Sequence, residues 1–132
     1  MAGRQSSRTF TEVELEFMQV LWSRGDVTTE DVQAALRKQG RDLADGSIRK
    51  ILSILKRKGH VERRKEGRGF VYSAKVPKAQ ADRSMVMDLM ERAFGGSATL
   101  MVASLLDTRA LHKKEMEEIK RLIAESESEG RK

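Results

Sequence analysis

The chain has 132 residues, which is enough for one domain or for a small domain with an appended region. Its 26 Lys and Arg against 20 Asp and Glu give a net charge of +6, so we expect a polyanionic partner, nucleic acid before an acidic membrane surface. It contains no cysteine, which excludes disulfides, thiol catalysis and cysteine-based metal sites.

The beginning of the chain carries no recognisable targeting signal. Residues 1–8 are polar and lack the apolar stretch of a secretion signal. No apolar run approaches the ~18 residues that a membrane span requires. We therefore expect a cytoplasmic protein that does not insert into membranes, with a disordered arm over residues 1–9.

A capping box opens each of the first two predicted helices. Thr11 and Glu14 have the T-x-x-E spacing in which each side chain bonds the other residue's backbone N–H. The helix that follows is expected to end near residue 23. Thr28 and Asp31 repeat the arrangement, and the second helix is expected to end near residue 38.

Residues 46–58 predict a third helix, and this helix is amphipathic. Ile48, Ile51, Leu52 and Leu55 recur at i, i+3, i+4 and i+7, which places them on one side. The other side carries Gly46, Arg49, Lys50, Ser53, Lys56 and Arg57. Taken alone, such a helix is more often a solvated basic surface than a binding surface.

The distribution of charge along the chain favours a binding surface over a solvated one. Residues 45–78 hold eleven Lys and Arg against three Asp and Glu, whereas residues 79–132 hold nine against ten. The basic character is therefore one patch in the middle of the chain. Two separate functions for the two parts are the simplest explanation.

After Gly59 the hydrophobic period changes from 3.6 to 2, and residues 61–74 predict a β-hairpin with a glycine-containing turn. Three helices followed by a hairpin is the order of a winged helix-turn-helix domain, here residues 10–76. The third helix would enter the major groove, which is about 12 Å wide. The fold class is thus mostly α with a small β-hairpin (α+β).

The predicted winged helix-turn-helix arrangement indicates which residues contact DNA. Arg49, Lys50 and Ser53 are expected at base edges, and Gly46 and Ser47 against a phosphate at the helix N-terminus. Phosphate contacts are expected from Lys56, Arg57, Arg63, Arg64, Lys65 and Arg68. For Tyr72, a hydrogen bond to a phosphate and a core ring with a hydrated hydroxyl are equally open.

Residues 77–126 predict three more helices, over 78–94, 98–106 and 113–125, followed by a disordered tail at 127–132. About 50 residues are too few to bury a core of their own. We therefore expect a two-fold dimer, with an intramolecular helical subdomain as the alternative. The expected dimerisation residues are Met85, Val86, Leu89, Met90, Phe94, Leu100, Met101, Val102, Leu105, Leu106, Met116, Ile119, Leu122 and Ile123.

Catalysis and metal binding find no support in the sequence. His60 and His112 are isolated from carboxylates at ligand spacing, so we expect no metal site and no cofactor. Acid–base or nucleophilic catalysis needs convergent groups, and no such motif is present, so we expect no enzyme. The alternative to a DNA-binding repressor is a winged-helix interaction module that binds an acidic protein partner.

Five segments in order carry a family resemblance. They are TEVELEFMQVLW (11–22), VTTEDVQAAL (27–36), ILSILKRKGHVER (51–63), GRGFVY (67–72) and FGGS (94–97). Over residues 10–125 the chain resembles the penicillinase-repressor and methicillin-resistance-repressor family of bacterial winged-helix proteins. The resemblance implies a homodimer that binds a palindromic operator and represses transcription of antibiotic-resistance genes.

The resemblance also implies how repression ends. In the best-known members an antibiotic-activated membrane sensor system triggers proteolysis, and the corresponding bond here lies near Ser104 and Leu105. The chain departs from the family at Gly46, Ser47 and Lys50, where the family commonly has threonine, and at Ile54, where it has arginine. The operator sequence therefore does not follow from the resemblance. The neighbourhood of Ser104 and Leu105 also differs from that of the β-lactam-responsive members, so the inducing signal does not follow either. The lack of cysteine excludes the sensing mode of the copper-responsive relatives.

Overall fold

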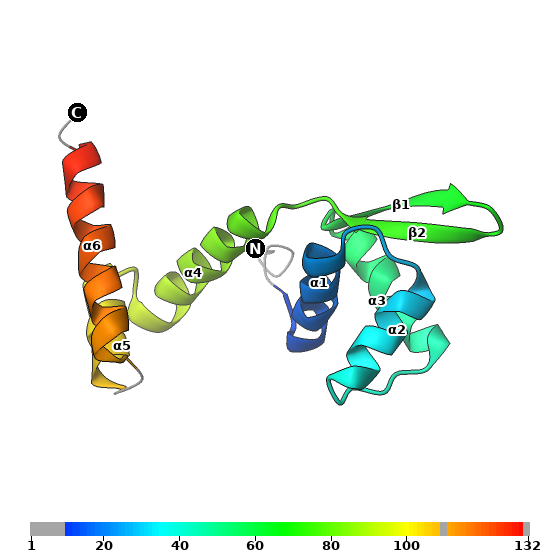
Figure 1. Cartoon of the computed structure of the whole chain (residues 1–132), viewed down its shortest axis with the longest axis horizontal. Coiled ribbons are helices and arrows are strands. Elements are labelled where there is room, and N and C mark those ends of the chain that lie inside the picture. Colours follow the sequence, from blue (N-terminus) through cyan, green and yellow to red (C-terminus); the bar gives the residue numbers. More distant parts are fainter. Residues whose placement is uncertain (1–9, 109–110, 131–132) are drawn as a thin grey trace. The chain divides into compact units, whose positions relative to one another are not determined.

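The computed structural model describes residues 10–108 and 111–130. The elements are α1 (Glu12–Arg24), α2 (Thr29–Lys38), α3 (Asp45–Arg57), β1 (Val61–Glu66), β2 (Gly69–Ala74), α4 (Lys78–Phe94), α5 (Ala98–Asp107) and α6 (Lys113–Gly130) (Figure 1). This order confirms the predicted fold class, mostly α with one small hairpin. The arm predicted over residues 1–9 lies outside the described residues.

The chain divides into two compact units, and the boundary between them falls within the sequence of α4. The first ends at Asp88 and the second begins at Leu89. The sequence analysis had the helical dimerisation region begin at residue 77. Across the part of the chain that is described, no helix combines the length and the apolar character needed to cross a membrane.

Both predicted capping boxes are present. The Glu14 N–H donates to Thr11 Oγ1 over 3.1 Å, and the Thr11 N–H donates to Glu14 Oε1 over 2.9 Å. Asp31 and Thr28 exchange the corresponding bonds at 3.1 and 3.0 Å. Each helix therefore begins where the sequence predicts, because a side chain satisfies backbone donors that the helix itself leaves unpaired.

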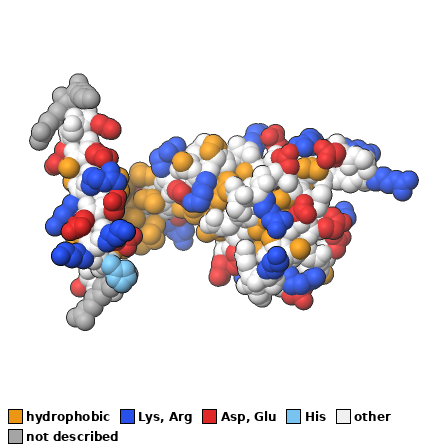
Figure 2. Space-filling model, in the orientation of Figure 1, with side chains coloured by type: hydrophobic (Ala, Val, Ile, Leu, Met, Phe, Trp, Pro, Cys, Tyr) orange, Lys and Arg blue, Asp and Glu red, His pale blue; other side chains and the backbone are white. Residues whose placement is uncertain are grey.

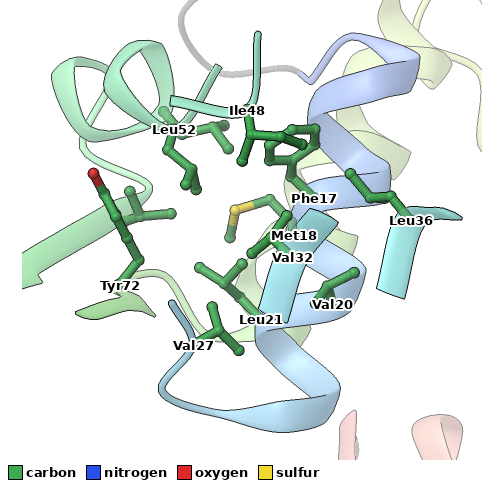
Figure 3. Packing of buried hydrophobic residues seen from close by; sticks show 12 residues of the cluster. Phe17, Met18, Val20, Leu21, Val27, Val32, Leu36, Ile48, Leu52 and Tyr72 are labelled. Atoms are coloured by element: carbon green, nitrogen blue, oxygen red, sulfur yellow. The ribbon is translucent and has the colours of Figure 1, made fainter. Parts of the chain in front are cut away.

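The core of the first unit lies where α1, α2, α3 and the hairpin meet (Figure 3). Ile48, Leu52 and Leu55 are fully buried, whereas Ile51 lies at the edge of the core and is only partly buried. The buried members of this cluster are Phe17, Met18, Val20, Leu21, Val27, Val32, Leu36, Ile48, Leu52, Leu55, Val61 and Tyr72. Burial of this apolar stripe fixes which side of α3 faces solvent.

The hairpin forms with the predicted limits and is joined to the loop before α2. Its antiparallel register pairs Val61 with Ala74 and Arg63 with Tyr72. The Val27 N–H donates to the Tyr72 carbonyl over 2.9 Å, and the Tyr72 N–H donates to the Val27 carbonyl over 2.8 Å. The base of the hairpin is therefore attached to the helical core through backbone bonds.

A partly buried ion pair joins the start of α1 to the end of α3. The Glu14 side chain is nearly inaccessible, and the Lys58 ammonium donates to both of its carboxylate oxygens, at 3.1 and 3.0 Å. Sequence analysis did not find this pair, because the two residues lie 44 positions apart. Lys58 is thus the cation at the end of α3 that turns inward.

The second unit contains the end of α4 together with α5 and α6. Gly95 and Gly96 adopt positive φ values of 57° and 84°, and the Gly96 N–H donates to the Met90 carbonyl over 2.9 Å. This geometry ends α4 at the predicted position, because glycine adopts the left-handed region at little cost.

Apolar side chains of α4, α5 and α6 remain accessible in the single chain, and Figure 2 shows such side chains gathered on the surface where α4 ends. All of α5 is described, and none of its residues is buried. Of the expected dimerisation residues, Met85, Met90, Phe94, Met101, Met116 and Ile119 are half-buried. The others, Val86, Leu89, Leu100, Val102, Leu105, Leu106, Leu122 and Ile123, are exposed.

One prediction about the end of the chain is wrong. α6 continues to Gly130, where the sequence analysis expected a disordered tail from residue 127. Adding a residue to an existing helix costs little, since each added residue contributes a backbone hydrogen bond. Residues 131–132 lie outside the described residues.

Replacing Glu14 by Gln is expected to lower the free energy of unfolding by about 1–3 kcal/mol, because Lys58 loses its charge partner in a largely buried site. Chemical denaturation monitored by circular dichroism measures the change. The matched control is Glu12→Gln, an exposed carboxylate in the same first turn. Equal stability of both variants would contradict a role for the pair in the fold.

Candidate nucleic-acid interface

The exposed side of α3 carries the residues that the sequence assigns to DNA. Gly46, Ser47, Arg49, Lys50, Ser53, Lys56 and Arg57 are all exposed. A Cβ atom built on Gly46 would meet nothing within 4 Å, so the backbone there is open to close approach. The apolar stripe beneath holds these side chains on one accessible surface, which we call the α3 face.

The first turn of α3 lacks the side-chain cap that α1 and α2 have. Its N-cap residue, Ala44, makes no side-chain hydrogen bond to the helix. Gly46 and Ser47 lie in this first turn, where backbone N–H groups have no partner within a helix. The positive end of the helix dipole adds to the attraction for an anion.

Arg49 is held by a carboxylate that the sequence analysis did not single out. Its Nε–H donates to Asp45 Oδ2 over 2.7 Å, and both side chains are more than half exposed. This hydrogen bond and the charge of Asp45 raise the pKa of Arg49 above its ordinary value, and Glu30 contributes more weakly. The i,i+4 spacing of Asp45 and Arg49 is the signal that could have predicted the pair.

Six of the predicted DNA contacts are exposed cations that pair with no carboxylate. Over residues 10–108 and 111–130 the following side chains form no ion pair: Lys50, Lys56, Arg57, Arg63, Lys65 and Arg68. Figure 2 shows Lys and Arg side chains at the tip of the hairpin. Cations with no internal partner are the ones available to an external polyanion.

Arg64 differs from these six because its guanidinium pairs with carboxylates of the protein. Its Nη2 lies 2.9 Å from Asp26 Oδ2 and 3.2 Å from Glu66 Oε2. The bond to Asp26 is the main cause that raises the pKa of Arg64. The sequence grouped Arg64 with the phosphate contacts; in the structure its ion pair with Asp26 joins β1 to the loop before α2.

Two aromatic residues of the hairpin have different environments. Phe70 is 36% exposed, and the guanidinium carbon of Arg63 lies 4.0 Å from its ring centroid. This cation–π contact restricts the Arg63 side chain. The Tyr72 ring is 5% exposed and belongs to the core, with its hydroxyl at the outer edge of the cluster (Figure 3).

A groove of about 330 Å³ lies between the start of α2, Arg49 of α3 and the hairpin. It brings Arg49 and Arg68 together, although they come from different elements, and it also contains Glu30 and Glu66. The interface is therefore not uniformly cationic. The lining residues are Thr28, Thr29, Glu30, Arg49, Glu66, Arg68, Gly69, Phe70, Val71 and Tyr72.

Neither histidine belongs to the α3 face as defined above. The His60 ring contacts Phe10, with ring centroids 4.5 Å apart. The His112 carbonyl accepts the Met116 N–H over 2.9 Å at the start of α6. Among the residues that the structure describes, no group of three or more His, Cys, Asp or Glu could hold a metal ion.

Comparisons with known proteins agree with this geometry. A family model described as penicillinase repressor matches residues 10–125. The chain is 29% identical to an uncharacterised 16.5 kDa protein of Latilactobacillus sakei, covering 90% of this chain and 81% of that protein. It is 27% identical to the penicillinase repressor of Bacillus licheniformis, covering 87% and 89%. In fold it is similar to hsRosR-S4 in a complex structure, with a TM-score of 0.54 at 16% identity, covering 95% and 96%.

Replacing Arg64 by Ala is expected to loosen the hairpin, because β1 loses its ion pair with Asp26. Amide hydrogen exchange should quicken at Val27 and Tyr72, while the midpoint of thermal unfolding changes little, since the pair is solvent-exposed. Lys65→Ala, the adjacent change without an ion pair, should leave these amides protected. Unchanged exchange in Arg64→Ala would show that the backbone bonds alone hold the hairpin.

Proposed function

The chain belongs to the penicillinase repressor family, whose members are DNA-binding transcriptional repressors and not enzymes. On this basis we propose that it represses transcription as a dimer bound to a palindromic operator. The observation that carries the proposal is the α3 face, where exposed cations without internal partners lie on an amphipathic helix beside a basic hairpin. Such a helix fits the major groove, and a hairpin beside it can follow the DNA backbone.

The proposed contacts fall into two groups. Arg49, Lys50 and Ser53 meet base edges in the major groove, where side chains distinguish one base pair from another. Contacts to phosphates hold the domain in register, through the free N–H groups of Gly46 and Ser47 and through the cations. These cations are Lys56, Arg57, Arg63, Lys65 and Arg68, with the Tyr72 hydroxyl as a further donor; Arg64 is assigned instead to the attachment of the hairpin.

Dimerisation through α4, α5 and α6 follows from the apolar side chains that the single chain leaves uncovered. Leu100 is 59% exposed and Leu122 is 57% exposed, and seven further large apolar residues of these helices are also exposed. Exposed apolar patches of this kind mark association surfaces. A second copy of the chain would cover them, and two-fold symmetry would present two α3 helices to the two halves of a palindrome.

The proposal includes release by proteolysis near Ser104 and Leu105, triggered by a membrane sensor system. Both residues lie in α5 and are exposed in the single chain. A protease binds its substrate in an extended form, so α5 has to unwind locally before cleavage. Cleavage there would separate α6 from the rest of the chain and so remove part of the proposed dimer surface.

Replacing Arg49 and Lys50 together by Ala is expected to reduce binding to the selected operator by at least about tenfold, since each good base contact contributes ~1–3 kcal/mol of discrimination. The operator is first selected from a random duplex library with the unmodified chain, and gel-shift titration then measures affinity. Lys113→Ala with Lys114→Ala, on α6, removes the same charge and serves as control.

If the unmodified chain bound selected and random duplexes equally, the operator proposal would be wrong. That result would instead favour the interaction module with an acidic protein partner.

Leu122→Glu is expected to convert the protein from dimer to monomer, because a charge replaces an apolar side chain in the proposed interface. Sedimentation velocity measures the oligomeric state, and Lys120→Glu on the same helix is the control. The monomeric variant should still bind a half-site. It should lose the higher affinity that the dimer has for a full palindrome. A monomeric unmodified chain at micromolar concentration would refute the dimer.

A further inference from the structure

We propose that Asp45 is a positioning residue that sets base specificity by directing the guanidinium of Arg49 toward a guanine edge and away from phosphates. The inference rests on the proposed function, because it concerns how the α3 face distinguishes one DNA sequence from another. Asp45 is itself an anion on a surface that would approach a polyanion. Its presence there therefore requires a role that outweighs its repulsion of DNA.

The geometry of the pair leaves the outer part of Arg49 available. Asp45 accepts only the Nε–H, over 2.7 Å. An arginine carries five N–H donors, so the two terminal nitrogens keep four of them. In the part of the chain that is described, these terminal nitrogens donate no further hydrogen bond.

Two free terminal nitrogens match the requirement for reading guanine. The O6 and N7 atoms of guanine accept two parallel N–H bonds in the major groove, and a planar guanidinium supplies them. Asp45 lies in the first turn of α3, and a helical side chain leans toward the N-terminus of its helix. Arg49 therefore lies over the first turn, which is the part of a recognition helix that meets base edges.

The charge of Asp45 also discriminates between the two kinds of acceptor. Paired with Asp45, the Arg49 guanidinium carries little net charge toward a phosphate at longer range. Glu30 of α2 lies on the same groove and adds to the negative potential at Arg49. Lys50, the next residue, has no carboxylate partner and keeps its full attraction for phosphates. Adjacent cations on α3 thus differ in the acceptor that they favour.

The proposal predicts changes of opposite sign when Asp45 is replaced by Ala. Affinity for a random duplex should rise about twofold, because one negative charge near the DNA is removed. The ratio of affinities for the selected and the random duplex should fall by about fivefold or more, because Arg49 loses its orientation. Fluorescence anisotropy at one fixed salt concentration measures both affinities, and a new selection with the variant should lose a guanine preference in each half-site.

Three further variants give this test its controls. Asp45→Glu keeps a carboxylate at i,i+4 from Arg49 and should retain the ratio. Asp42 lies outside α3, and its Oδ1 lies 3.3 Å from the Nε of Arg37. Asp42→Ala therefore removes a carboxylate that does not contact Arg49 and should leave the ratio unchanged. Asp45→Ala combined with Arg49→Ala should give the ratio of Arg49→Ala alone, since a residue that acts through another has no effect once the other is absent.

Several results would overturn the inference. An unchanged ratio in Asp45→Ala would mean that Asp45 only repels DNA. Equal losses for both duplexes, together with a lower midpoint of thermal unfolding, would mean that Asp45 only supports the first turn of α3. Independent effects of Asp45 and Arg49 in the double variant would exclude action through Arg49. Failure of the unmodified chain to select any sequence would refute the proposed function itself, whereas the other outcomes leave it intact.

Discussion

Burial of the apolar stripe on α3 is the constraint on which the rest of the structure depends. Ile48, Leu52 and Leu55 are fully inaccessible in a core built from α1, α2 and the hairpin. A helix anchored along one side has no freedom to rotate about its axis, so the opposite side stays in solvent. The α3 face owes its orientation to this core and not to contacts among its own polar residues.

Carboxylates of the protein divide the cations of the basic patch into two sets. Lys58 is paired with Glu14, Arg64 with Asp26 and Glu66, and Arg49 with Asp45. The cations without such partners are free to neutralise an external polyanion. The positive net charge therefore overstates the number of side chains available to DNA. A cation paired with a carboxylate of the protein positions the elements that it joins and attracts DNA less strongly.

In the second unit apolar side chains are left accessible, whereas the apolar stripe of α3 in the first unit is buried. In α5 seven of the ten side chains are apolar, yet no residue of this helix is buried in the single chain. Short helices have too little volume to enclose such side chains by themselves. The dimer proposed above would account for the apolar sequence of α5, since a second copy of the chain would cover these side chains.

The sequence by itself determined the element order, the capping boxes at Thr11 and Thr28, the hairpin at residues 61–74 and the exposed side of α3. These features depend on local spacing, which is legible along the chain. Only the tertiary structure decided that Lys58 and Arg64 turn to internal carboxylates and that the Tyr72 ring belongs to the core. Glu14 and Lys58 are 44 positions apart and Asp26 and Arg64 are 38 apart, so no local pattern pairs them. Such contacts exist only once packing of α1, α3 and the hairpin has brought distant segments together.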